Sequence, residues 1–201
     1  MSMNLLKPFL FFLFVLISLP AISATRFFIL DTPWQETLIL PNQAKKNLLV
    51  SIPTAAPGFN KRSLVYFDQQ YQVKYHKKAQ WVDTPARMLL PLLVHHLELT
   101  GLFKTVLSAS TSPIAASLRL DTEIVRLQQE FFTEPSQIHL VFRAQLLDMD
   151  AREVLATRVF EITENARSED AEGGMLATNR AIARLLKAIT KFVEKHHEQN
   201  K

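Results

Sequence analysis

The side chains best suited to chemistry in this chain are its six histidines, and their spacing argues against a metal centre. They stand singly at His76 and His139 and in adjacent pairs at His95-His96 and His196-His197. A helical zinc site typically uses His-Glu-x-x-His, which puts both imidazoles on one face, and no pair here has that spacing. Adjacent helical residues point about 100° apart, so His95 and His96 do not converge on one ion. We expect no bound metal.

Motifs for nucleophilic catalysis and phosphate binding are also missing from the sequence. It contains neither the Gly-x-Ser-x-Gly turn of hydrolases nor the Gly-x-x-x-x-Gly-Lys loop that cradles phosphates. Its one Gly-Gly pair, Gly173-Gly174, opens a predicted helix without the preceding strand that nucleotide binding needs. Glu169, Asp170 and Glu172 stand at the start of that helix, where negative charge opposes the positive end of the dipole. We therefore expect no catalytic set and no cofactor.

The first 24 residues have the three parts of a secretory signal peptide. Lys7 precedes an apolar run of 11 residues, Phe9–Leu19, and small residues follow Pro20. As a helix the run rises about 16 Å, roughly half of a bilayer's hydrocarbon core, so it is short for a permanent span. We expect residues 1–24 to be a signal peptide, cleaved after Ser23 or Ala24, and the remaining chain to work in the periplasm.

The composition limits the classes of protein to consider. The 201 residues include no cysteine, which excludes disulfides, thiolate metal sites and the acylated cysteine of a lipoprotein. The net charge is +4, but acidic and basic residues are interspersed, and an exported chain is a poor candidate for nucleic-acid binding. A weak attraction to anionic lipid headgroups is compatible with the charge. Residues 25–201 are enough for one domain with a sizeable core.

The hydrophobic pattern predicts an α+β fold. Period-2 alternation and short β-branched runs indicate strands, with a hairpin around Asp68-Gln69-Gln70 and a turn over Thr54–Gly58. The expected strands lie at Phe27–Leu30, Leu48–Ile52, Ser63–Phe67, Tyr71–His76, Phe103–Leu107, Leu118–Ile124, Ile138–Leu146 and Val154–Thr163, with a further apolar stretch at Leu38–Leu40. Such strands, each with one buried face, favour a mostly antiparallel sheet, which two predicted helices accompany.

The two helices are predicted from their start signals and apolar stripes. The first starts at Thr84-Pro85, where Thr84 can cap free amides, and it stops at Gly101; Pro91 inside it predicts a kink. The second runs from about Ala171 to His196, and its apolar stripe is Met175, Ile182, Leu185, Leu186, Ile189, Phe192 and Val193. A basic stripe, Arg180, Arg184, Lys187 and Lys191, is either a partner-binding surface or an ordinary solvated face.

Proline and aromatic residues mark a candidate partner surface. It comprises two segments, the Pro53–Phe59 loop and the Trp81–Pro85 turn, with Pro53, Pro57, Gly58, Phe59, Trp81 and Pro85 as the residues of interest. The alternative is that these residues shape turns and fill the core. The same two interpretations apply to a wider aromatic set, Phe59, Trp81, Phe131 and Phe132, which either faces a lipid or partner or packs inside.

Several of these segments, in their order and spacing, resemble one known family, the ABC-type transport auxiliary component family with its PqiC-like envelope lipoproteins. The similarity extends roughly from Phe27 to Val193. The segments that carry it are Leu49–Phe59, Leu64–Tyr66, Val73–His76, Trp81–Leu89, Leu120–Phe131, the Val141–Leu155 hairpin with Asp148 and Arg152 near its turn, and the Ala-rich final helix. Many members carry a lipobox cysteine, whereas this chain has Ile22-Ser23-Ala24 there.

The resemblance implies a fold and a function. The fold is similar to the N-terminal domain of TolB, a mixed sheet with two helices, and the family's proteins are not enzymes. It implies a periplasmic auxiliary subunit that partners a mammalian-cell-entry-type substrate-binding protein and its ABC permease and ATPase, in transport of lipids or organic solvents. Lipid or membrane-surface contact and a homo-oligomer are further expectations. The alternative is a structural envelope or secretion-assembly factor with the same fold and no transport role.

Overall fold

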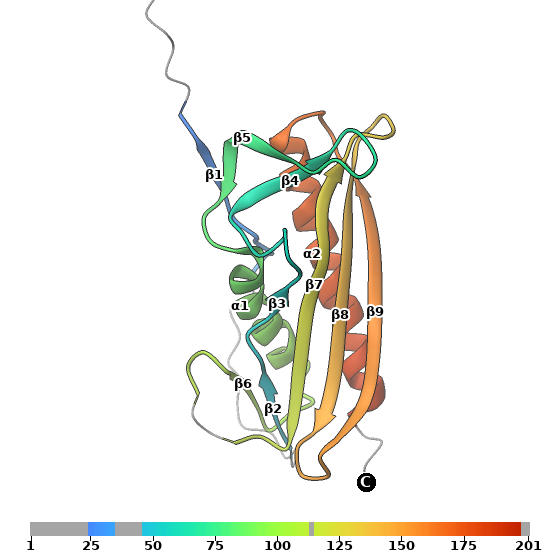
Figure 1. The fold of residues 1–201 in the computed structure, drawn as a ribbon. Coiled ribbons are helices and arrows are strands. Elements are labelled where there is room, and N and C mark those ends of the chain that lie inside the picture. Colours follow the sequence, from blue (N-terminus) through green and yellow to red (C-terminus); the bar gives the residue numbers. More distant parts are fainter. Residues whose placement is uncertain (1–23, 35–45, 113–114, 198–201) are drawn as a thin grey trace, which may run out of the picture.

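One long strand, β7 (Leu118–Glu130), connects the parts of the sheet. The structure is a computed structural model that describes residues 24–34, 46–112 and 115–197, and within these ranges nine strands form one sheet with two helices (Figure 1). The other elements are β1 (Arg26–Phe28), β2 (Asn47–Val50), β3 (Thr54–Ala55), β4 (Ser63–Phe67), β5 (Lys74–Trp81), α1 (Pro85–Glu98), β6 (Thr105–Ser108), β8 (Gln137–Asp148), β9 (Glu153–Asn165) and α2 (Ala171–His196).

Strand β7 is paired along both of its edges. On one edge β8 runs antiparallel to it from Leu118 to Glu130, and β9 in turn runs antiparallel to β8. On the other edge three short strands, β2, β3 and β4, pair with it in succession, all of them parallel. Beyond them, β6 adds to β2, while β5 and then β1 add to β4. The mixed sheet is therefore a three-stranded antiparallel half joined to a set of short strands.

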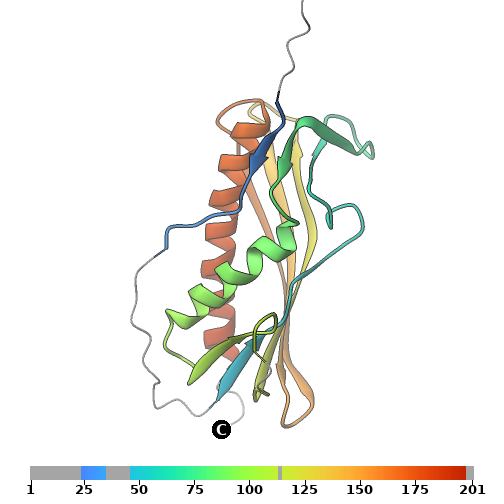
Figure 2. The same ribbon diagram turned by 90° about the vertical axis from the view of Figure 1, so that its left-hand side faces the viewer.

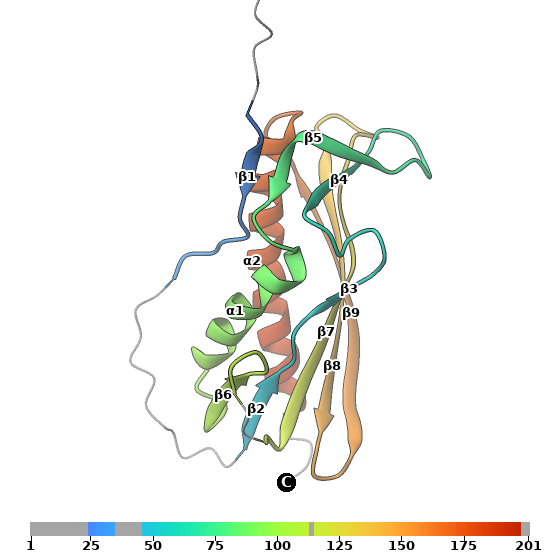
Figure 3. The same cartoon turned by 60° about the vertical axis from the view of Figure 1, so that its left-hand side comes forward.

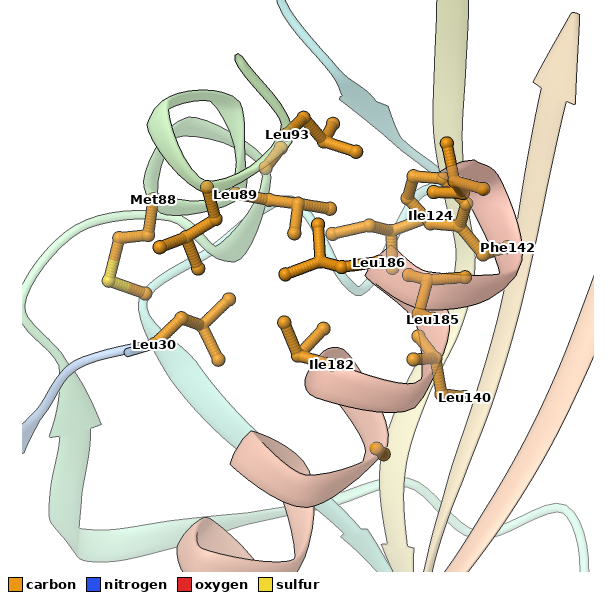
Figure 4. Close-up of a cluster of buried hydrophobic side chains, with 14 of the residues drawn as sticks. Leu30, Met88, Leu89, Leu93, Ile124, Leu140, Phe142, Ile182, Leu185 and Leu186 are labelled. Atoms are coloured by element: carbon orange, nitrogen blue, oxygen red, sulfur yellow. The ribbon is translucent and has the colours of Figure 1, made fainter. Parts of the chain in front are cut away.

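Both helices cover the same face of the sheet. Figures 2 and 3 show α1 and α2 together on one side, with α2 running along β8 and β9 and α1 crossing nearer to β2 and β6. The core lies between the two helices and the sheet. It includes Leu89 and Leu93 of α1, Leu185 of α2 and Phe142 of the sheet (Figure 4). Burying each such side chain stabilises the fold by about 1.5–3 kcal/mol before entropy is subtracted.

Buried and accessible residues alternate along the long strands because the helices cover only one face of the sheet. In β8, every second residue from Ile138 to Leu146 is buried, and the residues between them are half-buried or exposed. The opposite face of β7 and β8 carries polar residues that pair with one another, such as Arg119 Nη2 with Asp121 Oδ2 at 2.8 Å. A strand with one dry and one wet face needs this pattern.

The start of α2 is held by a cap and by close packing. The Asp170 side chain accepts a hydrogen bond from Gly173 N at 2.8 Å, and this bond is the main reason that the pKa of Asp170 lies below its usual value. A Cβ added to Gly173 would collide with backbone atoms of Ser168, and one added to Gly174 would collide with the Gln129 side chain. The Gly-Gly pair therefore serves helix packing.

The structure confirms the α+β class, the mixed sheet and the two helices, and it corrects several details. Strand β5 begins at Lys74 and extends to Trp81, so Tyr71 lies in the hairpin turn and Trp81 ends a strand. Thr54 and Ala55 form β3, where a turn was predicted. The Thr84 side chain makes no capping hydrogen bond. The Thr84 backbone carbonyl accepts a hydrogen bond from Met88 N at 3.1 Å, the first bond of the helix.

Other predictions have a simpler outcome. Helix α2 has the predicted limits, and its predicted apolar stripe is buried throughout. Pro91 lies inside α1, and its kink stays a prediction. The signal peptide and the Leu38–Leu40 stretch lie outside the described residues. Among the residues that are described, neither helix combines the length and the apolar character that crossing a membrane requires.

Replacing Gly173 by alanine tests the packing at the start of α2. Alanine usually favours a helix over glycine by about 1 kcal/mol, but here its methyl group meets the Ser168 backbone. We expect the free energy of unfolding to fall by about 1–3 kcal/mol, measured by chemical denaturation. The matched control is Leu176→Ala on the exposed side of the same helix, which should change it by less than about 1 kcal/mol. A Gly173 variant more stable than the parent protein would contradict the packing argument.

Candidate functional site

An open groove of about 650 Å³ runs along one side of α1. Leu90, Pro91 and Val94 of α1 form its floor, Ile52 borders it after β2, and Trp34 borders it from the segment that follows β1. Ser108 of β6 stands at its rim. The walls are mainly apolar, as in sites that bind apolar ligands or peptide segments.

The groove exists because α1 is apolar on two sides. Its residues Met88, Leu89, Leu92, Leu93 and Leu97 face the core, whereas Leu90, Pro91, Val94 and His95 line the groove. A helix that is apolar nearly all round is normally covered on every side. Between Pro85 and Leu97 only Arg87, His95 and His96 are polar or charged. One side of α1 thus has the composition of a buried face but borders an open groove.

Two rings and one unpartnered nitrogen give the groove a polar feature. The ring centroids of Trp34 and His95 lie 4.4 Å apart with an interplanar angle of 31°. His95 is buried, and its Nε2 atom has no hydrogen-bond partner among the described residues. A buried polar atom without a partner is costly, at about 1–3 kcal/mol, and a ligand that offers a donor or acceptor there regains part of this.

The charged residues around the groove are few and lie at its ends. Arg87 Nε is 3.2 Å from Asp83 Oδ2, one turn earlier, so its charge is partly neutralised. Glu98 is at the other end, and its partial burial raises the pKa of the carboxyl above the usual value. Burial likewise lowers the pKa of His96, on the adjacent side of α1. These shifts favour uncharged side chains, so the groove suits an apolar segment.

The six predicted partner-binding residues lie outside this groove and divide by accessibility. Pro53, Trp81 and Pro85 are buried, and Trp81, at 4% exposure, belongs to the core. Pro57 and Gly58 lie in an accessible turn, where Gly58 adopts a φ of +96° that suits glycine. Phe59 N donates to Ala56 O at 3.0 Å, and the Phe59 ring is half-buried against the core. The role of this surface in binding stays a prediction.

Trp34 was missed in the sequence because it stands alone. It follows the turn-prone Asp31-Thr32-Pro33, with no periodic apolar pattern to mark it. The pattern of α1 did carry a usable signal, since Leu90, Pro91 and Val94 add a second apolar side at spacings of one, three and four. This second apolar side of α1, which does not face the core, could have predicted the groove.

The basic stripe on α2 is divided between two roles. Arg180 Nε and Arg184 Nη1 each donate to the Glu164 carboxylate at 2.9 Å, and these bonds lower the pKa of Glu164. These two residues therefore fasten α2 to β9. Lys187 and Lys191 are exposed and border a shallower hollow of about 410 Å³ between α1 and α2. The basic stripe is therefore not a single partner-binding surface.

Metal binding has no support in the part of the chain that the structure describes. Within residues 24–34, 46–112 and 115–197, no group of three or more histidine or carboxylate side chains is arranged to hold an ion. The closest approach to such a cluster is His139, whose Nδ1 is 2.9 Å from Glu130 Oε1 and whose Nε2 is 2.8 Å from Glu161 Oε1. These contacts join β7, β8 and β9 on the open face of the sheet.

Comparison with known proteins identifies the class to which this fold belongs. The family model of the ABC-type transport auxiliary lipoprotein component matches residues 28–190. The chain belongs to this family, although its 201 residues include no lipobox cysteine. Among curated proteins, no sequence gives a significant match.

Solved structures support the same fold. Protein XCC0632 from Xanthomonas campestris, of the DUF330 family model, is similar with a TM-score of 0.76 at 18% identity, over 87% of this chain and 98% of that one. The crystal structure of a second protein, itself uncharacterized, gives a TM-score of 0.66 at 13% identity, over 85% of this chain and 99% of that one. At these identities the likeness concerns the fold alone.

Substituting Trp81 tests whether it is a core residue. Trp81→Ala should lower the free energy of unfolding by about 3–5 kcal/mol, because removal of this large buried side chain creates a cavity in the core. The comparison variant is Phe132→Ala, whose ring is 46% exposed and whose loss should cost less than about 1 kcal/mol. Denaturant titration of both proteins gives the two values. Similar small losses in both would mean that Trp81 is not packed as described.

A second prediction concerns the pH dependence of stability. Burial lowers the pKa of His76, so the folded protein holds fewer protons on this ring than the unfolded chain does. The contribution of neutral, partly buried His76 to stability is complete above the ordinary histidine pKa, near 6.5. It declines as the pH falls below that value. The melting temperature should therefore drop between pH 7.5 and pH 5, and it should drop less in His76→Gln. The same slope in both proteins would rule out His76 as its source.

Proposed function

We propose that this protein is a non-enzymatic periplasmic auxiliary subunit of an ABC-type transport system for lipids or organic solvents, of the mammalian-cell-entry type. Its family membership makes it an auxiliary component of ABC-type transport. The finer statement adds that it docks on the substrate-binding component of that system, together with the permease and the ATPase. Export by way of residues 1–24 would place it on the periplasmic side, where such a component works.

The observation that supports docking best is the open apolar groove along α1. It offers Trp34, Ile52 and Val94 as exposed or half-buried contacts. An extended or helical segment of a partner can bury its apolar side chains there.

The loop Pro57–Phe59 stays part of the proposed docking surface. Pro57 is exposed and Gly58 is half-buried, so a partner can reach both without unfolding the domain. Ile52, at the border of the groove, directly precedes Pro53 in the chain. The buried members of the same set, Pro53, Trp81 and Pro85, would support this loop from beneath.

Removing the exposed side chains of the groove tests the docking. Trp34 and Ile52 are 57% and 50% exposed, so the double variant Trp34→Ser/Ile52→Ser should keep its melting temperature within a few degrees. We expect its co-purification with the substrate-binding component, from detergent-solubilised membranes, to fall at least tenfold, because central aromatic contacts dominate binding energies.

The matched control lies on β9. Val154 and Val159 are 52% and 58% exposed, and Val154→Ser/Val159→Ser removes a comparable apolar area away from the groove. This variant should co-purify as the parent protein does. Equal recovery of all three proteins would reject the groove as the docking surface. Failure of the parent protein to co-purify with any ABC transport component would reject the proposed function.

A further inference from the structure

Exposed aromatic side chains gather at one end of the molecule. Of the five exposed aromatic residues in the described ranges, only Trp34 borders the groove; the others are Phe27, Tyr71, Tyr75 and Phe132. Tyr71 is 95% exposed at the tip of the β4–β5 hairpin, and Tyr75 follows in β5. Phe131 N donates to Phe67 O at 2.8 Å, so the loop that contains Phe132 adjoins this hairpin.

The hairpin at this end carries a positive net charge. The segment Phe59–Trp81 contains five basic residues and one acidic residue, so its net charge of +4 equals that of the entire chain. The single acid, Asp68, is engaged by Lys74, with 2.6 Å between Oδ2 and Nζ. Lys77 and Lys78 are both exposed. The hairpin therefore places positive charge beside the exposed rings.

The backbone projects these side chains outward. The pairing of β4 with β5 is irregular: Ser63 pairs with Gln80, but Val65 pairs with Tyr75. Between these two pairs the chain advances by two residues in β4 and by five residues in β5. The extra residues, which include Lys77 and Lys78, bend β5 across the upper end of the molecule (Figures 1 and 3). Such irregularities redirect side chains. Tyr71 has a φ of 64°, a conformation that residues other than glycine seldom adopt.

The N-terminal strand leads to the same end. Strand β1 adds to β5 in parallel, with Arg26 beside Ala79, so the first described residues lie at this end (Figure 1). Only six residues, Pro20–Thr25, separate β1 from the apolar run Phe9–Leu19, a span of at most about 20 Å. Cleavage after Ser23 or Ala24 would instead leave a positively charged amino group beside Arg26. That amino group would add positive charge at this end, which favours a negatively charged membrane surface.

We propose that this end, defined by Phe27, Tyr71, Val73, Tyr75, Lys77, Lys78 and Phe132 and here named the hairpin end, docks on the surface of a bilayer that contains anionic lipids. Aromatic side chains settle at the headgroup level, and nearby lysines gain from the negative surface potential. This combination of exposed rings and basic charge is the pattern of interfacial membrane contacts. The inference concerns a different surface from the groove and does not depend on the transport partner.

An acidic protein is the competing occupant, and the residues favour the bilayer. The exposed rings come from three separate places, β1, the β4–β5 hairpin and the β7–β8 loop. A planar surface reaches several protruding tips at once. The hollow near His76, at about 20 Å³, is too small for a protein side chain. Two exposed acids also lie at this end, Glu134 in the β7–β8 loop and Glu172, which pairs with Arg26; both would stay in the aqueous layer.

Vesicle binding by the exported protein tests the proposal. Purified from the periplasm, it should sediment with phosphatidylglycerol–phosphatidylcholine vesicles and far less with phosphatidylcholine alone, and 0.5 M salt should release it. Lys77→Gln/Lys78→Gln should weaken binding about 25-fold, since each cation near the surface contributes about fivefold. The matched control, Lys187→Gln/Lys191→Gln, removes the same charge from exposed positions on α2 and should change binding less than twofold.

A site-specific readout separates the hairpin end from the rest of the chain. In Tyr71→Trp, brominated lipids should quench the new indole, whereas the emission of the parent protein, from Trp34 and Trp81, should stay nearly constant. Equal binding to neutral and anionic vesicles, equal losses in the two lysine variants, or an unquenched indole at position 71 would each overturn the proposal. Crosslinking from position 71 to an acidic protein in place of lipid would also overturn it.

Discussion

Burial of a single face of the sheet is the constraint on which this structure depends. Helix α2 lies along β8 and β9, and α1 packs beside it, so that only one face of the long strands is dry. Every second residue of β8 must therefore be apolar, and the residues between them carry the polar contacts of the open face. The start of α2 fits because Gly173 and Gly174 let it approach Ser168 and Gln129. The position of α1 then leaves one of its apolar sides at the groove.

The sequence predicted elements whose signals are local. Helix α2 was placed correctly because Asp170, the apolar stripe and the charged end all mark it. The β4–β5 hairpin was found for the same reason, but Tyr71 was placed in the strand because its alternation with Val73 and Tyr75 continues into the turn. The parallel pairings of β2, β3 and β4 with β7 were beyond reach, since each joins residues more than 60 positions apart.

The groove and the hairpin end were harder to find in the sequence than the fold. Prolines and Trp81 drew attention because such residues shape turns and fill interfaces, yet Trp81 ends a strand and is buried in the core. The groove combines Trp34, Ile52 and α1, three segments whose proximity only the tertiary structure defines. The basic charge of the hairpin was averaged out in a composition that is nearly balanced elsewhere. Local sequence patterns describe surfaces poorly when the contributing segments are distant in the chain.

The groove and the hairpin end use different parts of the fold, so occupation of one does not block the other. The groove borders α1 and β6, whereas the hairpin end is formed by β5 with the neighbouring loop and β1 (Figure 3). They are linked through a short stretch of chain, because α1 follows β5 after only Val82, Asp83 and Thr84. Since Trp81 anchors the end of β5 in the core, a membrane that holds the hairpin end would also hold α1 at a fixed height above its surface. Anchoring of this kind restricts the orientations in which a membrane-bound partner can meet the groove, and it raises the effective concentration of the two proteins without any additional contact between them.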